Sequence, residues 1–318
     1  MGFTSAKMLL LGLATLASAQ FTFVGGLDSN SSVLGNYYNY WVKTGDLWDL
    51  TRSDRLPVTS PKTIQCNGKR KEILIEPSRS ALVIIDMQNF FLHPALSPKA
   101  TAGRAIVNTT VDMVHGFRKA GMKVLWTNWG LDNFDLLTIP PANLDGFSSN
   151  HSSLTTFGSD MGIVPGTKIN AGRKLMRGSW NAQPYGPLYH LQVEGVKRGT
   201  DLYFNKNRLS GLWGAQTPLG LWLQENEITT LFFGGVNADQ CVWSTFIDAY
   251  FKGFDVVYVE DISATTSPYY ATEMLKYNAN GDGSLAHDLH VTHNCPQIIR
   301  SCSEVAEANG RAMQTVTI

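Results

Sequence analysis

The stretch that decides the fold is Ser80-Ala81-Leu82-Val83-Ile84-Ile85-Asp86. Five aliphatic residues in a row are typical of a strand that is buried on both faces, as in a parallel sheet covered by helices. The run ends in a carboxylate, which places Asp86 at the carboxyl end of that strand. The stretch therefore predicts both the core of an α/β domain and the edge of the sheet at which chemistry should be sought.

Further strands and helices alternate after this stretch. Apolar runs predict strands at 122–127, 202–205, 230–236 and 254–259. Helical spacing predicts helices at 102–120, at 218–224 and from Cys241 to about Lys252, with Gly121 and Gly253 as stops. Strands and helices that alternate at these lengths favour an α/β fold with three αβα layers, in which helices cover both faces of a mostly parallel sheet.

Three side chains able to take part in catalysis follow the ends of predicted strands: Asp86, Lys206 and Cys241. Ligands of parallel sheets bind outside the carboxyl ends of the strands, so we expect these three groups to lie together. A thiol at a helix N-terminus feels the positive end of the dipole, which predicts a lowered pKa and a nucleophilic Cys241. Burial should raise the pKa of Asp86 and suit it to accept the thiol proton. The alternatives are a buried hydrophobic cysteine, a polar strand terminator and a solvated lysine.

Three ordered blocks carry a resemblance to a known family: residues 86–91, 206–212 and 235–242, with sequences DMQNFF, KNRLSGL and GVNADQCV. They resemble the signature blocks of isochorismatase-like cysteine hydrolases, and the likeness extends from about Ile75 to Ala279. It implies a six-stranded sheet and an Asp86–Lys206–Cys241 catalytic triad. It also implies a cis peptide between Val236 and Asn237, with the backbone N–H groups of Asn237 and Cys241 facing an oxyanion.

The resemblance further implies cleavage of a C–N bond, amide or ureide, through a cysteine thioester. Within the family, residues 128–132, 173–180 and 206–211 look most like the ureidoacrylate amidohydrolase type, although residues 180–183 lack its usual acidic groups. Zinc-dependent members carry histidines where this chain has Trp129, so we expect no metal and no cofactor. A vinyl ether hydrolase of the isochorismate type and a non-catalytic binding or effector protein remain the alternatives.

The substrate contacts are predicted from the same blocks. Aromatic side chains at Phe91, Trp129 and Trp180 are candidates for a pocket wall suited to a small planar amide, and Gln88 and Arg208 for its polar contacts. The alternative for each aromatic residue is ordinary core filling.

The amino terminus predicts secretion. Lys7, the apolar run 8–17 and the small residues 17–19 form a signal peptide over residues 1–19, with a buried helix as the alternative. Sequons at Asn30, Asn108 and Asn150 are candidate glycosylation sites.

The remaining organisation is an N-terminal extension over 20–77 and a hydrolase domain over 78–318. The extension is polar and aromatic with little regular period, so we expect it to pack on the main domain or on a partner subunit. One disulfide is expected among Cys66, Cys295 and Cys302, without a defined pairing. A formal net charge of zero removes the electrostatic case for nucleic acid or a membrane surface, leaving a small-molecule substrate. The family resemblance allows a homo-oligomer.

Overall fold

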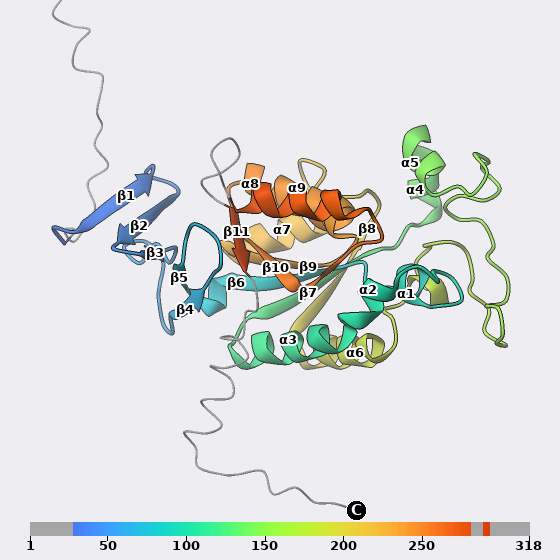
Figure 1. The fold of residues 1–318 in the computed structure, drawn as a ribbon, viewed down its shortest axis with the longest axis horizontal. Coiled ribbons are helices and arrows are strands. Elements are labelled where there is room, and N and C mark those ends of the chain that lie inside the picture. Colours follow the sequence, from blue (N-terminus) through green and yellow to red (C-terminus); the bar gives the residue numbers. More distant parts are fainter. Residues whose placement is uncertain (1–27, 281–288, 293–318) are drawn as a thin grey trace, which may run out of the picture.

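A computed structural model describes residues 28–280 and 289–292 of the 318-residue chain. The predicted signal peptide, Cys295 and Cys302 lie outside the described residues. Two sheets organise the described part, one in the N-terminal extension and one in the main domain (Figure 1). No helix in the described part of the chain has the length and apolar character needed to cross a bilayer.

The main sheet has six strands in the order β11-β10-β9-β6-β7-β8, and every neighbouring pair is parallel. This confirms the predicted α/β fold with a parallel six-stranded sheet. Strand β6 is buried along its whole length, as its unbroken aliphatic run requires. The strands are β6 (Ser80–Ile85), β7 (Lys123–Trp129), β8 (Asp201–Lys206), β9 (Thr230–Val236), β10 (Asp255–Ala264) and β11 (Leu289–Thr292).

Helices cover both faces of this sheet and complete the three layers (Figure 1). One face carries α3 (Val107–Lys119) and α6 (Pro187–Arg198), and the other carries α7 (Pro218–Glu225), α8 (Trp243–Phe251) and α9 (Tyr269–Ala279). Each layer has its own buried cluster, with Trp126 and Phe117 on the α3 side and Phe233 and Phe246 on the α8 side.

Short helical turns connect these elements, mostly near the carboxyl ends of the strands. The predicted helix over 102–120 is in fact two, because the backbone at Ile106 opens to a ψ of −2° between α2 and α3. The short elements are α1 (Asn89–Leu92), α2 (Thr101–Ala105), α4 (Asn133–Thr138), α5 (Pro141–Gly146), the 3-10 turns η1 (Pro77–Arg79) and η2 (Trp180–Ala182), and the π-helical turn η3 (Ala238–Val242).

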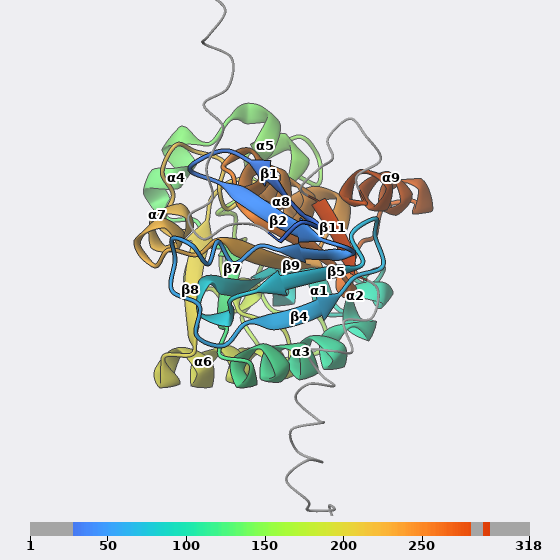
Figure 2. The same ribbon diagram turned by 90° about the vertical axis from the view of Figure 1, so that its left-hand side faces the viewer.

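The N-terminal extension contains a five-stranded sheet that its sequence pattern does not reveal. Its order is β1-β2-β3-β5-β4, and Figure 2, which views the chain from this side, shows it lying across the amino ends of the main sheet. The strands are only three to five residues long: β1 (Ser31–Gly35), β2 (Tyr40–Thr44), β3 (Leu47–Asp49), β4 (Lys62–Gln65) and β5 (Glu72–Ile75).

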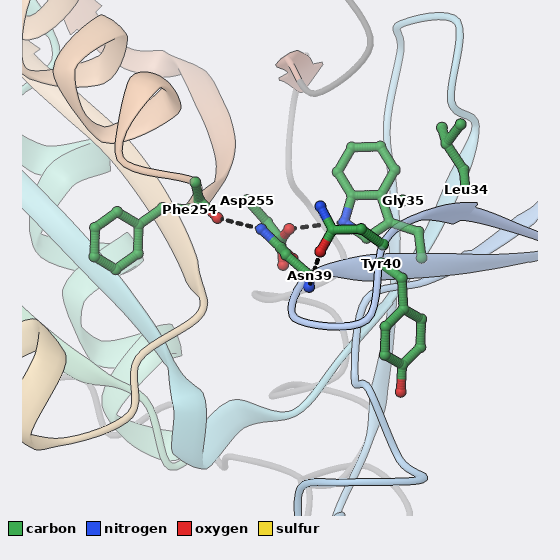
Figure 3. Close-up of a pocket in the computed structure, with 9 residues that line it drawn as sticks. Leu34, Gly35, Asn39, Tyr40, Phe254 and Asp255 are labelled. Atoms are coloured by element: carbon green, nitrogen blue, oxygen red, sulfur yellow. Dashed lines mark hydrogen bonds between the residues drawn. The ribbon is translucent and has the colours of Figure 1, made fainter. Parts of the chain in front are cut away.

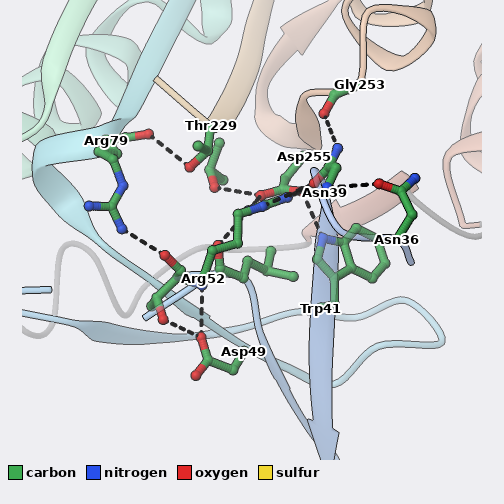
Figure 4. Close-up of polar contacts among 12 residues, drawn as sticks. Asn36, Asn39, Trp41, Asp49, Arg52, Arg79, Thr229, Gly253 and Asp255 are labelled. Carbon is green, nitrogen blue, oxygen red and sulfur yellow. Dashed lines mark hydrogen bonds and ion pairs between the residues drawn. The ribbon is translucent and has the colours of Figure 1, made fainter. Parts of the chain in front are cut away.

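A buried polar network joins the extension to the first residue of β10 (Figure 4). Arg52 donates to both carboxylate oxygens of Asp255, at 2.7 Å each, and the Trp41 indole donates to the same carboxylate at 2.7 Å. Thr230, the first residue of β9, adds a 3.1 Å hydrogen bond to Asp255, and Asn39 donates to Gly253 O at 2.8 Å. Because Arg52 and Asp255 are both buried, the extension is attached to the main domain through an interior ion pair.

The three sequons occupy exposed positions. Asn30 precedes β1, Asn108 lies in the first turn of α3, and Asn150 follows α5. Cys66, one of the three candidates for the expected disulfide, is buried in the core cluster that the extension shares with the main domain.

Candidate functional site

The strand order brings the three predicted catalytic groups to one edge of the sheet. Strands β6 and β9 are neighbours although a long stretch of chain separates them, and β7 and β8 continue from β6 on its other side. Asp86 follows β6, Lys206 ends β8, and Cys241 lies in η3, which follows β9. The site therefore sits at the switch point of the sheet, where parallel α/β folds commonly bind ligands.

Asp86 is held at the centre of this group and is fully buried. Its backbone has a φ of +52°, and its N–H donates to Thr127 O of β7 at 3.2 Å. One carboxylate oxygen accepts the Trp129 backbone N–H at 3.0 Å, and the other lies 2.9 Å from Lys206 Nζ. Burial raises the pKa of Asp86, as predicted, although Lys206 and the Cys241 thiol act against that rise.

Lys206 is 4% exposed and reaches Asp86 across the end of β7. Its ammonium also donates to Arg208 O at 3.1 Å and lies 3.9 Å from the centroid of the Trp129 ring. The lysine is therefore fixed by a carboxylate, a carbonyl and an aromatic face, and is not the solvated surface lysine of the alternative interpretation.

Cys241 is 3% exposed, and its sulfur forms no disulfide within the described part of the chain. It lies inside a π-helical turn that begins at Ala238, so helical structure starts before the predicted start at Cys241, and Thr245 holds the Cys241 carbonyl with a 2.8 Å hydrogen bond. The peptide between Val236 and Asn237 is cis, in agreement with the family resemblance. The thiol and the Asp86 carboxylate interact, which works to lower the pKa of Asp86 and to raise the pKa of Cys241.

The expected lowering of the Cys241 pKa is wrong for this closed site. Burial raises the pKa of the thiol to about 12, the neighbouring Asp86 charge adds to the rise, and Lys206 opposes it. A helix dipole cannot compensate for the removal of the thiolate from water at a site this deep. The resting group is thus a thiol paired with a carboxylate, so the proton must leave as the sulfur attacks.

Aromatic side chains cover the three groups. Trp129, the last residue of β7, is fully buried and contacts Phe147 and Phe157, with ring centroids 5.0 and 4.9 Å away. Phe147 and Phe157 lie 4.2 Å apart and come from the segment after α5. The sequence does not indicate either residue, because their segment is mostly polar and shows no period. Lys174 donates a hydrogen bond to Phe147 O at 2.9 Å, which holds the backbone at Phe147 in place.

The other predicted substrate contacts are distributed unevenly. Phe91 is half-buried beside Phe90, at 4.9 Å, and faces the same aromatic cluster. Trp180 lies apart from it, with its ring against His93 at 5.1 Å. Gln88 is fully buried, and its amide binds the Trp129 backbone on both sides, through N–H and carbonyl. Arg208 donates to Asn207 O and Thr138 O and lies over Trp213. The polar atoms of Gln88 and Arg208 are thus engaged with protein groups.

A concavity of about 410 Å³ opens next to the site and is lined by Phe91, Lys99, Asn237 and Thr266, among others. It borders Asn237, the residue on the carboxyl side of the cis peptide. Another concavity, of about 310 Å³, lies at the opposite end of the sheet between the β1–β2 turn and the start of β10 (Figure 3). Its polar groups are those of the Asn39–Asp255 network, which already bind one another.

The described residues include no group of three or more histidine, cysteine or acidic side chains arranged to hold a metal ion. The end of β7 carries Asn128 and Trp129.

Comparison with known proteins shows which family this chain resembles. The model of the isochorismatase domain matches residues 80–281. Solved structures similar to this chain include the nicotinamidase PncA from Bacillus subtilis, with 25% identity, 68% of this chain and 99% of that chain covered, and a TM-score of 0.48. They also include N-carbamoylsarcosine amidase from Thermoplasma acidophilum, with 22% identity, 63% and 91% coverage, and a TM-score of 0.45. Because the family model spans well over half of its 318 residues, the chain belongs to the isochorismatase family of hydrolases.

Proposed function

We propose that this protein is a secreted cysteine hydrolase that cleaves a C–N bond, amide or ureide, of a small molecule. One observation carries the proposal: a fully buried carboxylate, Asp86, contacts both the Lys206 ammonium, at 2.9 Å, and the Cys241 thiol. A pure binding protein gains nothing from such a cluster, since burying charged groups costs free energy unless they are paired and used.

The chemistry follows from the protonation states. Asp86 accepts the proton of Cys241 while the sulfur attacks the carbonyl carbon, so the negative charge of the carboxylate is passed to the substrate oxygen. The backbone N–H groups of Asn237 and Cys241 are the candidate donors to the tetrahedral oxyanion. Protonated Asp86 then gives its proton to the departing nitrogen, which leaves a thioester on the sulfur.

Hydrolysis of the thioester completes the cycle. Asp86, again a carboxylate, takes a proton from water as the water attacks the thioester carbonyl. The acid product leaves, and the proton returns to the sulfur. Throughout, Lys206 keeps the carboxylate aligned with the thiol, and its positive charge opposes the rise in the pKa of both groups.

The substrate we propose is a ureide or a simple amide. The match of residues 128–132 and 206–211 to the ureidoacrylate type supports a ureide, and the aromatic side chains Phe91 and Trp129 support a planar one. Secretion is proposed from the signal-like residues 1–19 and from three exposed sequons. A mobility shift of the secreted protein on treatment with an N-glycosidase would test the glycosylation.

The decisive experiment is a panel of small amides and ureides scored for ammonia release, with wild type, Cys241→Ser and Lys206→Met compared. We expect at least one substrate to turn over, Cys241→Ser to abolish turnover, and Lys206→Met to lower kcat by about a hundredfold or more. The exposed variant Leu154→Ser, whose side chain is 83% exposed, serves as the control and should retain wild-type activity.

The alternatives predict other results. Release of pyruvate from isochorismate that survives Cys241→Ser would favour the vinyl ether reaction, which needs the acid and not the nucleophile. No turnover across the panel by a folded protein, with Cys241 inert to iodoacetamide, would overturn the proposal in favour of a binding role.

A further inference from the structure

Trp129 is placed between the catalytic groups by the strand order. It ends β7, the strand that lies between β6, which leads to Asp86, and β8, which ends at Lys206. In the β7–β8 register Trp129 is the direct partner of Lys206. The Asp86–Lys206 ion pair crosses the end of β7, so the residue at this position lies next to it.

The residue contacts all three members of the triad through different atoms. Its backbone N–H donates to Asp86 at 3.0 Å, and its ring receives the Lys206 ammonium at 3.9 Å from the centroid. Its indole side chain interacts with the Cys241 sulfur, a contact that lowers the pKa of the thiol. Trp129 and Cys241 belong to the same buried cluster.

The indole N–H forms no hydrogen bond of normal geometry with any described residue, the Cys241 sulfur included, although Trp129 is fully buried. Leaving a buried donor unpaired costs about 1–3 kcal/mol, so tryptophan N–H groups in protein interiors usually find a partner. A neutral thiol is only a weak acceptor, whereas a thiolate forms a charge-assisted hydrogen bond. The resting site thus contains a donor that becomes satisfied only when the sulfur carries charge.

We propose that the Trp129 indole N–H is a fourth catalytic group, which donates a hydrogen bond to Cys241 Sγ as the proton passes to Asp86 and the thiolate forms. The inference rests on the proposed nucleophilic role of Cys241. No atom is transferred in this step: the donor is preorganised, and its interaction is stronger in the charged state than in the resting state, which is what accelerates a reaction.

The surroundings keep the indole in place. Gln88 accepts the Trp129 N–H at 3.1 Å and donates to its carbonyl at 2.8 Å, which fixes the backbone. Phe147 and Phe157 pack against the ring. The backbone and the ring of Trp129 are therefore held in place beside the Cys241 thiol before any substrate arrives.

The test replaces Trp129 with 3-benzothienylalanine, which keeps the shape of the ring and substitutes sulfur for the N–H. The backbone N–H to Asp86 and the ring face toward Lys206 are retained, so the replacement removes the indole donor alone. Trp129→Phe, which also lacks the N–H, is the second variant. The same benzothienyl replacement at Trp222, a half-buried residue of α7 outside the site, is the matched control.

The measurements are the rate of iodoacetamide labelling of Cys241, followed by peptide mass spectrometry, and kcat and KM on the best substrate. A lost charge-assisted hydrogen bond raises the thiol pKa by about one to two units, and the greater basicity of the sulfur partly compensates, so labelling should slow about three- to tenfold. We expect kcat to fall about ten- to a hundredfold with KM nearly unchanged. The Trp222 control should show wild-type values in both assays.

Each outcome decides a different question. Wild-type labelling and kcat in the Trp129 analogue, with wild-type protein active, would overturn the role of the N–H and leave the proposed function standing. Slower labelling in the analogue of a protein that turns over nothing would support the contact with the sulfur and overturn the proposed function. A Cys241 that neither labels nor catalyses in the wild type would overturn both.

Discussion

The buried pair Arg52–Asp255 permits a quantitative test of how the extension contributes to stability. Arg52 holds Asp255 through two hydrogen bonds of 2.7 Å, and the exposed fractions of the two side chains are 5% and 2%. Arg52→Met keeps most of the side-chain volume and leaves the carboxylate in the interior with only Trp41 and Thr230 as donors.

Breaking a buried pair from one side costs about 3–5 kcal/mol, because an uncompensated charge remains. We therefore expect Arg52→Met to lower the free energy of unfolding by about that amount, measured by urea denaturation of the mature protein with far-ultraviolet circular dichroism. Arg198→Met is the matched control, since Arg198 meets Glu194 at 3.4 Å on an exposed helix face and such pairs contribute about 0.3–0.5 kcal/mol.

A double-mutant cycle with Asp255→Asn separates the pair from its surroundings. The double variant should cost less than the sum of the two single variants, because the charge that Arg52 compensates is then absent. A loss below about 1 kcal/mol for Arg52→Met, equal to that of the Arg198 control, would refute the reasoning and show that the extension is not anchored through this carboxylate.

Two further predictions concern the aromatic side chains that shield Cys241 and the stability of the fold at low pH. Phe147→Ala removes four ring pairs, of which the two closest, with Trp129 and Phe157, are each worth about 0.5–1.5 kcal/mol. Iodoacetamide should therefore label Cys241 about five- to a hundredfold faster, whereas Leu154→Ala should leave the labelling rate unchanged. For Glu76, burial raises the pKa, but hydrogen bonds from Ser78, Thr59 and Ser60 outweigh it and lower the pKa from 4.5 to about 2. The ionised group therefore stabilises the fold above about pH 4.5 and loses that contribution as the pH falls toward 2, so Glu76→Gln should lower the urea midpoint at pH 7 and approach wild type at pH 2. Equal deficits at both pH values would contradict this assignment.

The main sheet could be predicted because its signals are local. The aliphatic run before Asp86 is visible without any partner strand, and the carboxyl ends of parallel strands converge by topology. Helix α6 could also have been found, since Pro187 opens it and Gly199 ends it in a left-handed conformation. The positions of Asp86, Lys206 and Cys241 relative to the strands followed from the same local information.

The extension sheet and the electrostatics of the site could not be predicted, for a shared reason. Strands as short as Leu47–Asp49 show no useful period, and their position depends on pairs as distant in sequence as Arg52 and Asp255. The raised pKa of Cys241 likewise depends on burial, to which Phe147 and Phe157 contribute from a polar segment. The residues that neighbour a short strand or the Cys241 thiol in the sequence do not indicate which distant residues will pair with it or bury it.

The docking of the extension bears on how the protein should be produced. A recombinant fragment trimmed to the boundary of the family match, at residue 80, would omit Trp41 and Arg52 and leave the carboxylate at the start of β10 facing solvent without its cation. Such a fragment would also lack Ile73 and Ile75. The apolar side chains of the main domain that pack against them would then be exposed to solvent, which favours aggregation. Expression trials should begin no later than residue 28, so that the whole five-stranded sheet is retained.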